Sequence, residues 1–154
     1  MTHLLYNCLV RPSLEIAKSC RESIESSQVG KCYQEYGFVL STGWDIKVLE
    51  KKILSSGRLL CRVVIDCDTF LPQREQEFEE KPERINEHGI HFLTKGVMKT
   101  SIVRRDLEGF EYNEEKNKYV ASHRVIGSES FVRYKLLEVR FQKKRYCAVA
   151  LLLE

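Results

Sequence analysis

The chain has 154 residues, of which 43% are hydrophobic and 31% are charged, and 25 basic against 22 acidic residues give a net charge of +3. This composition is typical of one folded domain or two small ones, and it excludes a strongly basic nucleic-acid-binding arm. No apolar run is long enough to span a bilayer, and the first residues lack the basic start and cleavage site of a signal peptide. We therefore expect an intracellular protein with no membrane partner.

The first seventy residues predict a strand, a helix and three further strands. Residues 2–10 are apolar enough for a buried strand, and Pro12 is expected to begin an amphipathic helix that ends at Ser26 and Ser27. In the last of the three strands apolar and polar residues alternate, so one of its faces should be buried. The three strands are expected at 29–40, 45–54 and 59–68, with turns at 42–43 and 55–57.

The second half predicts strands without a convincing helix. Leu71 and Pro72 mark the expected boundary between a domain over 1–71 and a domain over 72–154. Residues 77–85 read as a charged strand at a sheet edge, because Pro82 cannot donate to a central ladder. Further strands are expected over 90–96, 97–103 and 118–121, and a final hairpin is expected from Phe131 to the C-terminal apolar run.

These elements indicate an α+β fold that is mostly β. We expect an N-terminal strand-helix-three-strand domain, followed by a C-terminal OB-type β-barrel, since several short, punctuated strands are typical of a small closed barrel.

No catalytic motif is present, so we expect no active site, no metal and no cofactor. The six cysteines contain no C-x-x-C pair and are interpreted as free thiols that pack as small hydrophobes. Gly30 and Gly37 follow a helix rather than preceding one, which argues against a phosphate loop. Both glycines are instead expected to permit bulges or close backbone approach, with Cys32 packed between them.

Basic and aromatic residues gather on two adjacent predicted strands of the second half. On a barrel of this class such residues bind single-stranded nucleic acid by base stacking and phosphate attraction. The plainer alternative is that Phe92 belongs to the core and that the cations are ordinary surface residues. The candidate RNA-binding residues are His91, Phe92, Lys95, Lys99, Arg104 and Arg105.

With both halves in view, the chain resembles the stalk subunit of multisubunit DNA-directed RNA polymerases, the family of the seventh subunit of eukaryotic RNA polymerase II and of its archaeal counterpart, called E-prime. The similarity is densest in VGKCYQEYGFVL at 29–40 and continues in the strand that ends at Pro72. NEHGIHF at 86–92 and the closing hairpin VRYKLLEVRFQKKRYCAVALL are similar to segments of the family's barrel. The charged segment QEFEEKPERI departs from the glycine and valines that the family has there, and such divergence would suit a polymerase of a large DNA virus.

The resemblance implies a non-catalytic subunit that docks on the polymerase core at the clamp base, with its barrel by the RNA exit path. It also implies contact with nascent single-stranded RNA and a small helical stalk partner like the fourth subunit. The protein is then expected in the nucleus if it is cellular, and in the host cytoplasm or virion if it is viral. Carried over from the family, the candidate polymerase-docking residues are Tyr33, Tyr36, Gly37, Phe38, Ser56, Gly57 and Arg58.

Two other functions stay open at this point. A stand-alone RNA-binding factor of RNA processing or translation would use the same OB barrel and would need no polymerase. A small hydrolase or nuclease would use His88, His91 and the acidic run 73–83, although their spacing gives no sign of a catalytic arrangement.

Overall fold

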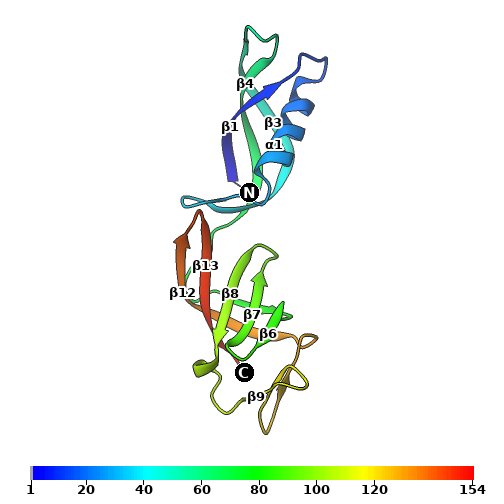
Figure 1. The fold of residues 1–154 in the computed structure, drawn as a ribbon. Helices are drawn as coiled ribbons and strands as arrows, with labels where there is room; N and C mark the ends of the chain where they lie inside the picture. Colours follow the sequence, from blue (N-terminus) through cyan, green and yellow to red (C-terminus); the bar gives the residue numbers. More distant parts are fainter. Residues whose placement is uncertain (1) are drawn as a thin grey trace. The chain divides into compact units, whose positions relative to one another are not determined.

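The computed structural model describes residues 2–154 and shows two compact units, with the division between Leu71 and Pro72 (Figure 1). Strands hold 56% of the residues and helix only 10%, so the fold is α+β and mostly β. No helix within residues 2–154 is long and apolar enough to cross a membrane.

The first unit is an antiparallel sheet with one helix. Its strands lie in the order β1-β4-β3-β2, and every neighbouring pair is antiparallel. The elements are β1 (Thr2–Val10), α1 (Ile16–Gln28), β2 (Cys32–Tyr33), β3 (Gly37–Ile53) and β4 (Leu59–Phe70).

Helix α1 covers one face of this sheet. Its apolar side presents Cys20 and Ile24 to a core that includes alternate residues of β4, from Leu59 to Cys67. The alternation predicted for 59–68 is therefore confirmed, since the intervening residues of that stretch are less buried. On the opposite face Leu5 and Leu9 of β1 remain 52% and 45% exposed.

The helix begins later than the sequence predicts. Pro12, Ser13 and Leu14 are not helical, and the first helical residue is Ile16. The Ser13 hydroxyl accepts a hydrogen bond from the Glu15 backbone N–H at 3.3 Å, a local bond that competes with helical geometry. Leu14, expected on the buried stripe, is consequently fully exposed.

The strand predicted over 29–40 is confirmed only at 32–33 and 37–40, and the turn predicted at 42–43 is wrong. The chain instead forms a tight hairpin in which Tyr33 pairs with Gly37, and β3 then continues through Thr42 to Ile53. Thr42 pairs with Cys67 and Ile46 with Ile65, so four steps along β3 match two along β4. Thr42 and Gly43, which the sequence predicts as a turn, therefore belong to a bulged part of β3.

Gly37 confirms the expectation of close backbone approach. Its φ is +80°, and a Cβ atom added there would lie 2.0 Å from the backbone oxygen of Phe70. Only glycine satisfies both the left-handed conformation and this contact. Gly30 also has a positive φ, but nothing lies within 4 Å of its would-be Cβ, so it serves a turn.

The second unit contains a six-stranded sheet in the order β5-β12-β13-β8-β7-β6 and a small sheet in the order β11-β10-β9. Strands β13 and β8 are parallel and the other pairs are antiparallel. The strands are β5 (Glu77–Glu80), β6 (Arg84–Asn86), β7 (Gly89–Thr94), β8 (Met98–Val103), β9 (Glu111–Asn113), β10 (Lys118–Val120), β11 (Val125–Ile126), β12 (Val132–Gln142) and β13 (Arg145–Leu152).

Pro82 divides the strand predicted at 77–85 into two. The residues before it form β5 and pair with β12, whereas those after it form β6 and pair with β7. The two edge strands of the six-stranded sheet are thus consecutive stretches of one chain segment, and the sheet curls round on itself. Just after the break the Glu83 backbone N–H donates to the His91 carbonyl at 2.8 Å, which ties β6 to β7.

A buried polar chain links the strands inside the curled sheet. The Tyr134 hydroxyl donates to Glu80 Oε1 at 3.0 Å and accepts from Thr94 Oγ1 at 2.7 Å, and Thr94 lies 2.6 Å from Thr100 Oγ1. Burial raises the pKa of Tyr134 above its ordinary value, and the nearby Glu80 carboxylate adds to that rise. The phenol therefore stays protonated and keeps its role as a donor.

The other strands of the second half agree with the sequence over β7, β8, β10 and the closing β12–β13 hairpin. The sequence does not predict β9, β11 or the single 3₁₀ turn Arg104–Asp106. These pieces have two or three residues each, which is too short for a hydrophobic period to register.

Candidate nucleic-acid interface

The curled sheet of the second unit has an apolar inner face and a polar outer face. On β7 and β8, Ile90, Phe92 and Met98 point inward and are buried, while the alternate positions His91 and Lys99 point outward. This arrangement follows from the period of two along a strand. The outer face is therefore available to a partner.

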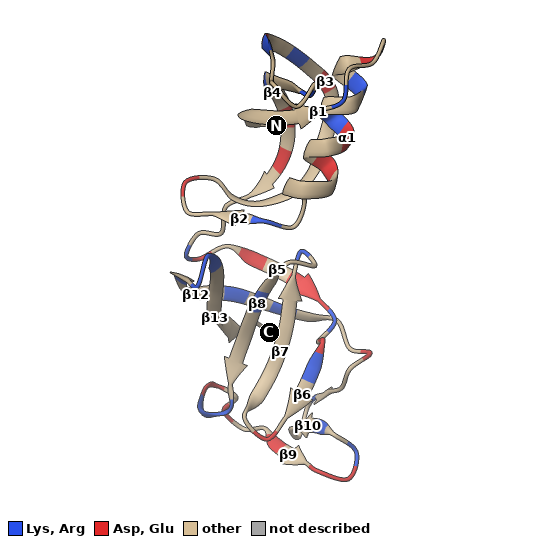
Figure 2. Ribbon diagram, turned by 45° about the horizontal axis from the view of Figure 1, so that its top comes forward, with Lys and Arg blue, Asp and Glu red and all other residues tan. Residues whose placement is uncertain are grey.

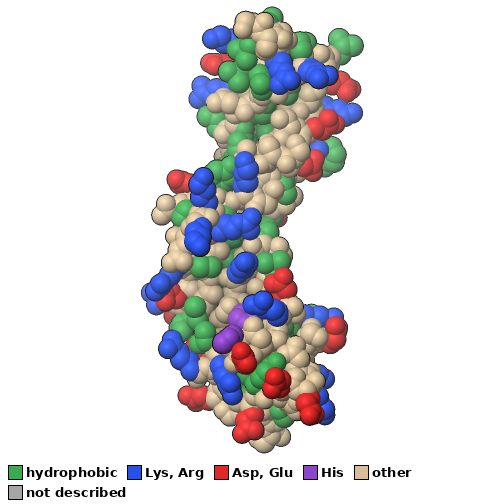
Figure 3. Space-filling view, viewed as in Figure 1, with side chains coloured by type: hydrophobic (Ala, Val, Ile, Leu, Met, Phe, Trp, Pro, Cys, Tyr) green, Lys and Arg blue, Asp and Glu red, His purple; other side chains and the backbone are tan. Residues whose placement is uncertain are grey.

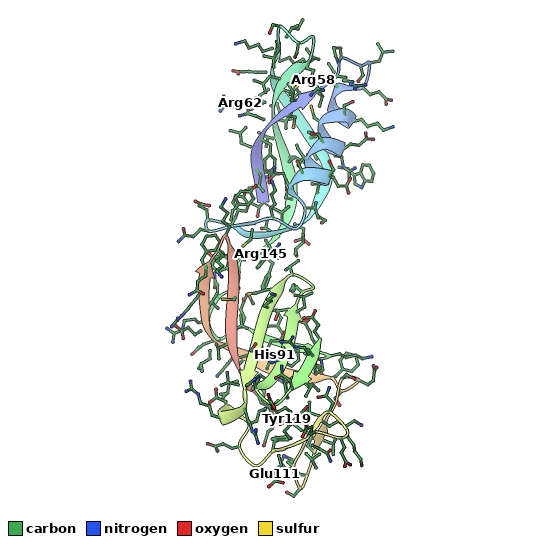
Figure 4. All side chains as sticks on the ribbon, viewed as in Figure 1. Arg58, Arg62, His91, Glu111, Tyr119 and Arg145 are labelled. Atoms are coloured by element: carbon green, nitrogen blue, oxygen red, sulfur yellow. The ribbon has the colours of Figure 1, made fainter. Side chains whose placement is uncertain are left out.

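The strand register gathers cations on that outer face from four strands. Arg84 of β6 lies opposite His91 of β7. Cys147 of β13 lies between two cations, with Lys99 of β8 opposite it on one side and Arg140 of β12 opposite it on the other. We call this surface the basic face (Figures 2 and 3). Its cations are Arg84, Lys99, Arg140 and Arg145, and Figure 4 shows Arg145 at the β12–β13 turn.

Two shallow grooves run over the basic face. The larger, of about 550 Å³, is lined by residues of β6, β7 and β8 that include Arg84, His91 and Lys99. The smaller, of about 320 Å³, is lined by β12 and β13 and includes Arg140. The acidic residues that line them are Glu83 and Glu138, and the Glu138 carboxylate accepts from Arg140 Nε–H at 2.9 Å. The three lining cations outnumber these two carboxylates, and Arg145 adds a fourth cation.

His91 is held by two hydrogen bonds in the larger groove. Its Nε2 lies 3.1 Å from Asn86 Oδ1, which also accepts the His88 backbone N–H, so His91 Nε2 carries the proton and donates. Its Nδ1 lies 2.7 Å from Ser101 Oγ and accepts. Desolvation, and then the positive charge of Arg84, lower the pKa of His91. The ring is thus neutral near pH 7, and both nitrogens are engaged within the sheet.

The structure brings together only part of the predicted RNA-binding set. His91 and Lys99 lie on the basic face, but Phe92 is 1% exposed and its ring centroid lies 4.3 Å from that of Tyr134. The stacking role predicted for Phe92 is therefore wrong, because no base can reach a ring inside the core. The plainer alternative, Phe92 as a core residue, is confirmed.

The remaining predicted cations lie at the two ends of the β7–β8 hairpin. Lys95 is in the turn that joins these strands, where its backbone N–H contacts the Glu80 carboxylate. Arg104 and Arg105 form the 3₁₀ turn that follows β8. The six residues of β8 separate the two groups by about 20 Å at 3.3 Å per residue, so they do not form one cluster.

The candidate docking residues also fall into two separate groups. Tyr33 and Tyr36 are half-buried against the core with ring centroids 4.9 Å apart. Gly37 and Phe38 are buried, and Phe38 stacks on Phe70, so a direct docking role for these two is wrong. The exposed group, at the other end of β3 in the β3–β4 turn, is Ser56, Gly57 and Arg58.

The cysteines pack as the sequence predicts. Cys8, Cys20, Cys32, Cys61 and Cys67 are buried, and Cys147 is half-buried. Burial raises the pKa of the Cys20 thiol to about 12. Such thiols are poor nucleophiles and poor metal ligands at neutral pH. Within residues 2–154 no three His, Cys, Asp or Glu side chains are grouped to hold a metal ion.

Sequence reasoning missed Arg84, Arg140 and Arg145. Alternation along the predicted hairpin could have shown that Arg140 points away from the core. The parallel pairing of β13 with β8 joins segments almost fifty residues apart, and nothing local in the sequence encodes it.

Comparison with known proteins adds no identification. A scan against protein-family models finds no match to this chain, and a search of curated proteins finds no similar sequence.

Proposed function

We propose that the second unit is an OB-type barrel that binds single-stranded RNA across its basic face. Strands β5 and β6 are two parts of one strand that Pro82 interrupts. If they are counted as one, the curled sheet has five strands. That number matches the five-stranded, partly open barrel of the OB fold, which binds oligonucleotides over its second and third strands. In this chain those strands are β7 and β8, which carry His91 and Lys99.

The observation that carries the proposal is the convergence of cations from four strands beside the two grooves. Arginine and lysine attract the phosphate backbone without reading its sequence. Alternation places Phe141 and Tyr146, which pair with each other, on the side opposite Arg140 and Cys147. Among the strand residues described, the basic face therefore carries no phenylalanine, tyrosine or tryptophan. Binding is then governed by phosphate attraction rather than by stacking.

We further propose that the chain works as a non-catalytic stalk subunit of a DNA-directed RNA polymerase. The support is the sequence resemblance, together with an exposed turn at Ser56–Arg58 in the first unit and an RNA-binding face in the second. In this role the first unit docks at the clamp base and the second contacts nascent RNA at the exit path. A helical stalk partner belongs to the same proposal.

Neutralising the basic face should weaken RNA binding. In the triple variant Lys99→Gln, Arg140→Gln and Arg145→Gln, we expect at least a tenfold loss of affinity for a 15-nucleotide single-stranded RNA at low salt. Because each phosphate contact contributes about 0.7 to the slope of log affinity against log salt, three lost contacts should flatten that slope by about 2. Fluorescence anisotropy from low to moderate salt measures both quantities.

The matched control carries the same charge change away from the basic face. Lys18, Lys31 and Lys116 are exposed, and their replacement by glutamine should leave the salt slope almost unchanged. An equal loss of affinity in both triple variants would show that net charge alone drives binding. A parent protein without salt-sensitive RNA binding would contradict the RNA proposal outright.

The polymerase proposal predicts a specific co-purification. The tagged protein, isolated from its source, should bring down the large polymerase subunits, and Arg58→Glu in the exposed turn should reduce their recovery severalfold without unfolding the first unit. Lys18→Glu, an equal charge reversal on helix α1, should not. Recovery of a free monomer that binds RNA would support the stand-alone RNA-binding factor instead.

A further inference from the structure

Strand β1 forms one edge of the sheet in the first unit (Figure 1). All nine of its residues pair with β4 in an unbroken register from Thr2↔Cys67 to Val10↔Leu59. The strand contains no proline, lysine, arginine, aspartate or glutamate, and it has no bulge. Natural edge strands are commonly protected by such charges, prolines or bulges. Strand β1 therefore has none of these usual protections.

The outer edge of β1 offers backbone groups for pairing. In an antiparallel ladder the N–H and C=O groups of alternate residues point away from the neighbouring strand. Within residues 2–154, the backbone hydrogen bonds of β1 are those to β4, and no other segment bonds to its outer edge. Several backbone donors and acceptors are thus positioned to receive one more strand.

The side chains beside this edge specify the chemistry of that strand. Leu5 and Leu9 are exposed on the face away from α1, and Asn7 lies between them. Arg62 of β4 lies directly opposite Asn7, and its guanidinium forms no salt bridge within the described chain. Figure 4 shows Arg62 on this sheet. It lies one strand in from the edge, on the same face of the sheet as Asn7.

A shallow groove of about 510 Å³ on the same face is basic. Arg62 and Lys52 point to this face together with Glu50, which lies opposite Arg62, so cations outnumber carboxylates two to one. A carboxylate on an added strand would therefore complement the groove. An added arginine or lysine would meet like charge.

We propose that β1 receives an extended segment of a partner polypeptide with the pattern apolar-x-acidic-x-apolar. The backbone of the segment pairs with β1, its apolar side chains cover Leu5 and Leu9, and its carboxylate meets Arg62. This is recognition by strand addition, in which the main chain provides affinity and alternate side chains provide specificity. The inference concerns the first unit alone and does not depend on RNA binding.

A second copy of this chain fits the edge poorly. Antiparallel self-pairing about Tyr6 places Leu5 opposite Asn7 and Leu9 opposite His3. Each leucine then faces a polar residue. Self-pairing about Asn7 instead places Leu5 opposite Leu9, but it also places Asn7 opposite Asn7. Neither register delivers a carboxylate to Arg62. A segment of different sequence satisfies both the leucines and the arginine.

A designed peptide tests the proposal on the full chain. The labelled peptide TTITETITT should bind saturably at one site by fluorescence anisotropy. Its proline-substituted form TPIPEPIPT, which lacks backbone donors beside each apolar residue, should bind at least tenfold more weakly. Leu5→Lys combined with Leu9→Lys should weaken the parent peptide by at least about tenfold, because both side chains are exposed and the lysines repel a covering apolar strand.

The contact with Arg62 has its own readout. Arg62→Gln should weaken TTITETITT severalfold but leave TTITQTITT unchanged, a difference that loss of folding would not produce. Leu49→Lys, which alters an exposed leucine of β3, is the matched control and should bind the peptide normally. The proposal fails if the peptide does not bind, or if the double lysine variant binds it equally well. It also fails if the protein sediments as a dimer that the double lysine variant dissociates.

Discussion

Gly37→Ala is expected to unfold the first unit at denaturant concentrations at which the parent is native. The added methyl group must overlap the Phe70 backbone oxygen, 2.0 Å from its ideal position, and the residue must keep a φ of +80°. Relief requires β3 and β4 to separate where Phe38 stacks on Phe70. We expect a loss of about 4 kcal/mol or more, combining backbone strain with a steric clash that cannot relax.

Trp44 provides the measurement. It is the only tryptophan, it lies in β3 of the first unit, and the Arg21 guanidinium sits 3.8 Å from its ring centroid. Its fluorescence during urea titration therefore reports on this unit. Arg21 is itself fixed by its Nε–H, which donates to the Gly43 carbonyl at 2.9 Å, so unfolding removes the stacked cation from the indole.

Gly57→Ala is the matched control for the clash. Its φ of +81° is nearly the same, but nothing lies within 4 Å of the added Cβ. It should therefore lose only the strain of a left-handed alanine, about 1–2 kcal/mol. Equal losses in the two variants would mean that the contact with Phe70 has no energetic weight.

Phe92→Ala should strongly destabilise the second unit. The ring is fully enclosed and packs on Tyr134, which is itself buried and joined to Thr94. Truncating a buried phenylalanine costs about 3–5 kcal/mol, since both the transfer free energy and the cavity count against the variant. Urea unfolding followed by tyrosine fluorescence and far-UV circular dichroism gives the difference in the free energy of unfolding.

The same variant separates a core role from a stacking role. Without urea, at a temperature where Phe92→Ala remains folded, its affinity for single-stranded RNA should equal that of the parent. Phe131→Ala is the control, because it removes a phenylalanine ring that is 62% exposed and lies beneath the Lys81 ammonium. This variant should change the free energy of unfolding by less than about 0.5 kcal/mol. A stable Phe92→Ala protein that had lost RNA binding would restore the stacking interpretation.

The sequence predicts the elements whose residues alternate or recur over several turns. Strand β4 and the β12–β13 hairpin carry long hydrophobic periods, and their positions are confirmed. The turn predicted at Thr42-Gly43 is wrong because a bulge and a turn use the same residue types, and only pairing with β4 distinguishes them. The predicted helix start is wrong because the Ser13 hydroxyl accepts the Glu15 backbone N–H. This local hydrogen bond competes with helical geometry, and the helix begins only at Ile16.

The candidate RNA interface is only partly predictable for a different reason. Lys99 and His91 are close in sequence and on adjacent strands, so local pattern finds them. Arg140 and Arg145 join them through the parallel pairing of β13 with β8, a long-range contact without a local signal. Phe92 is misassigned because an aromatic residue beside cations looks the same in sequence whether its ring faces the solvent or the core.

The break at Pro82 also constrains the order in which the second unit can be made. The first strand of this unit, β5, pairs with β12. Strand β13 comes last in chain order among the described strands and lies between β12 and β8. Completion of the sheet must therefore wait for the C-terminal residues. Pairing between such distant segments has a high contact order and is slow. A nascent chain would expose the apolar side of β7 and β8 until β13 has emerged, and this interval is where a chaperone would act.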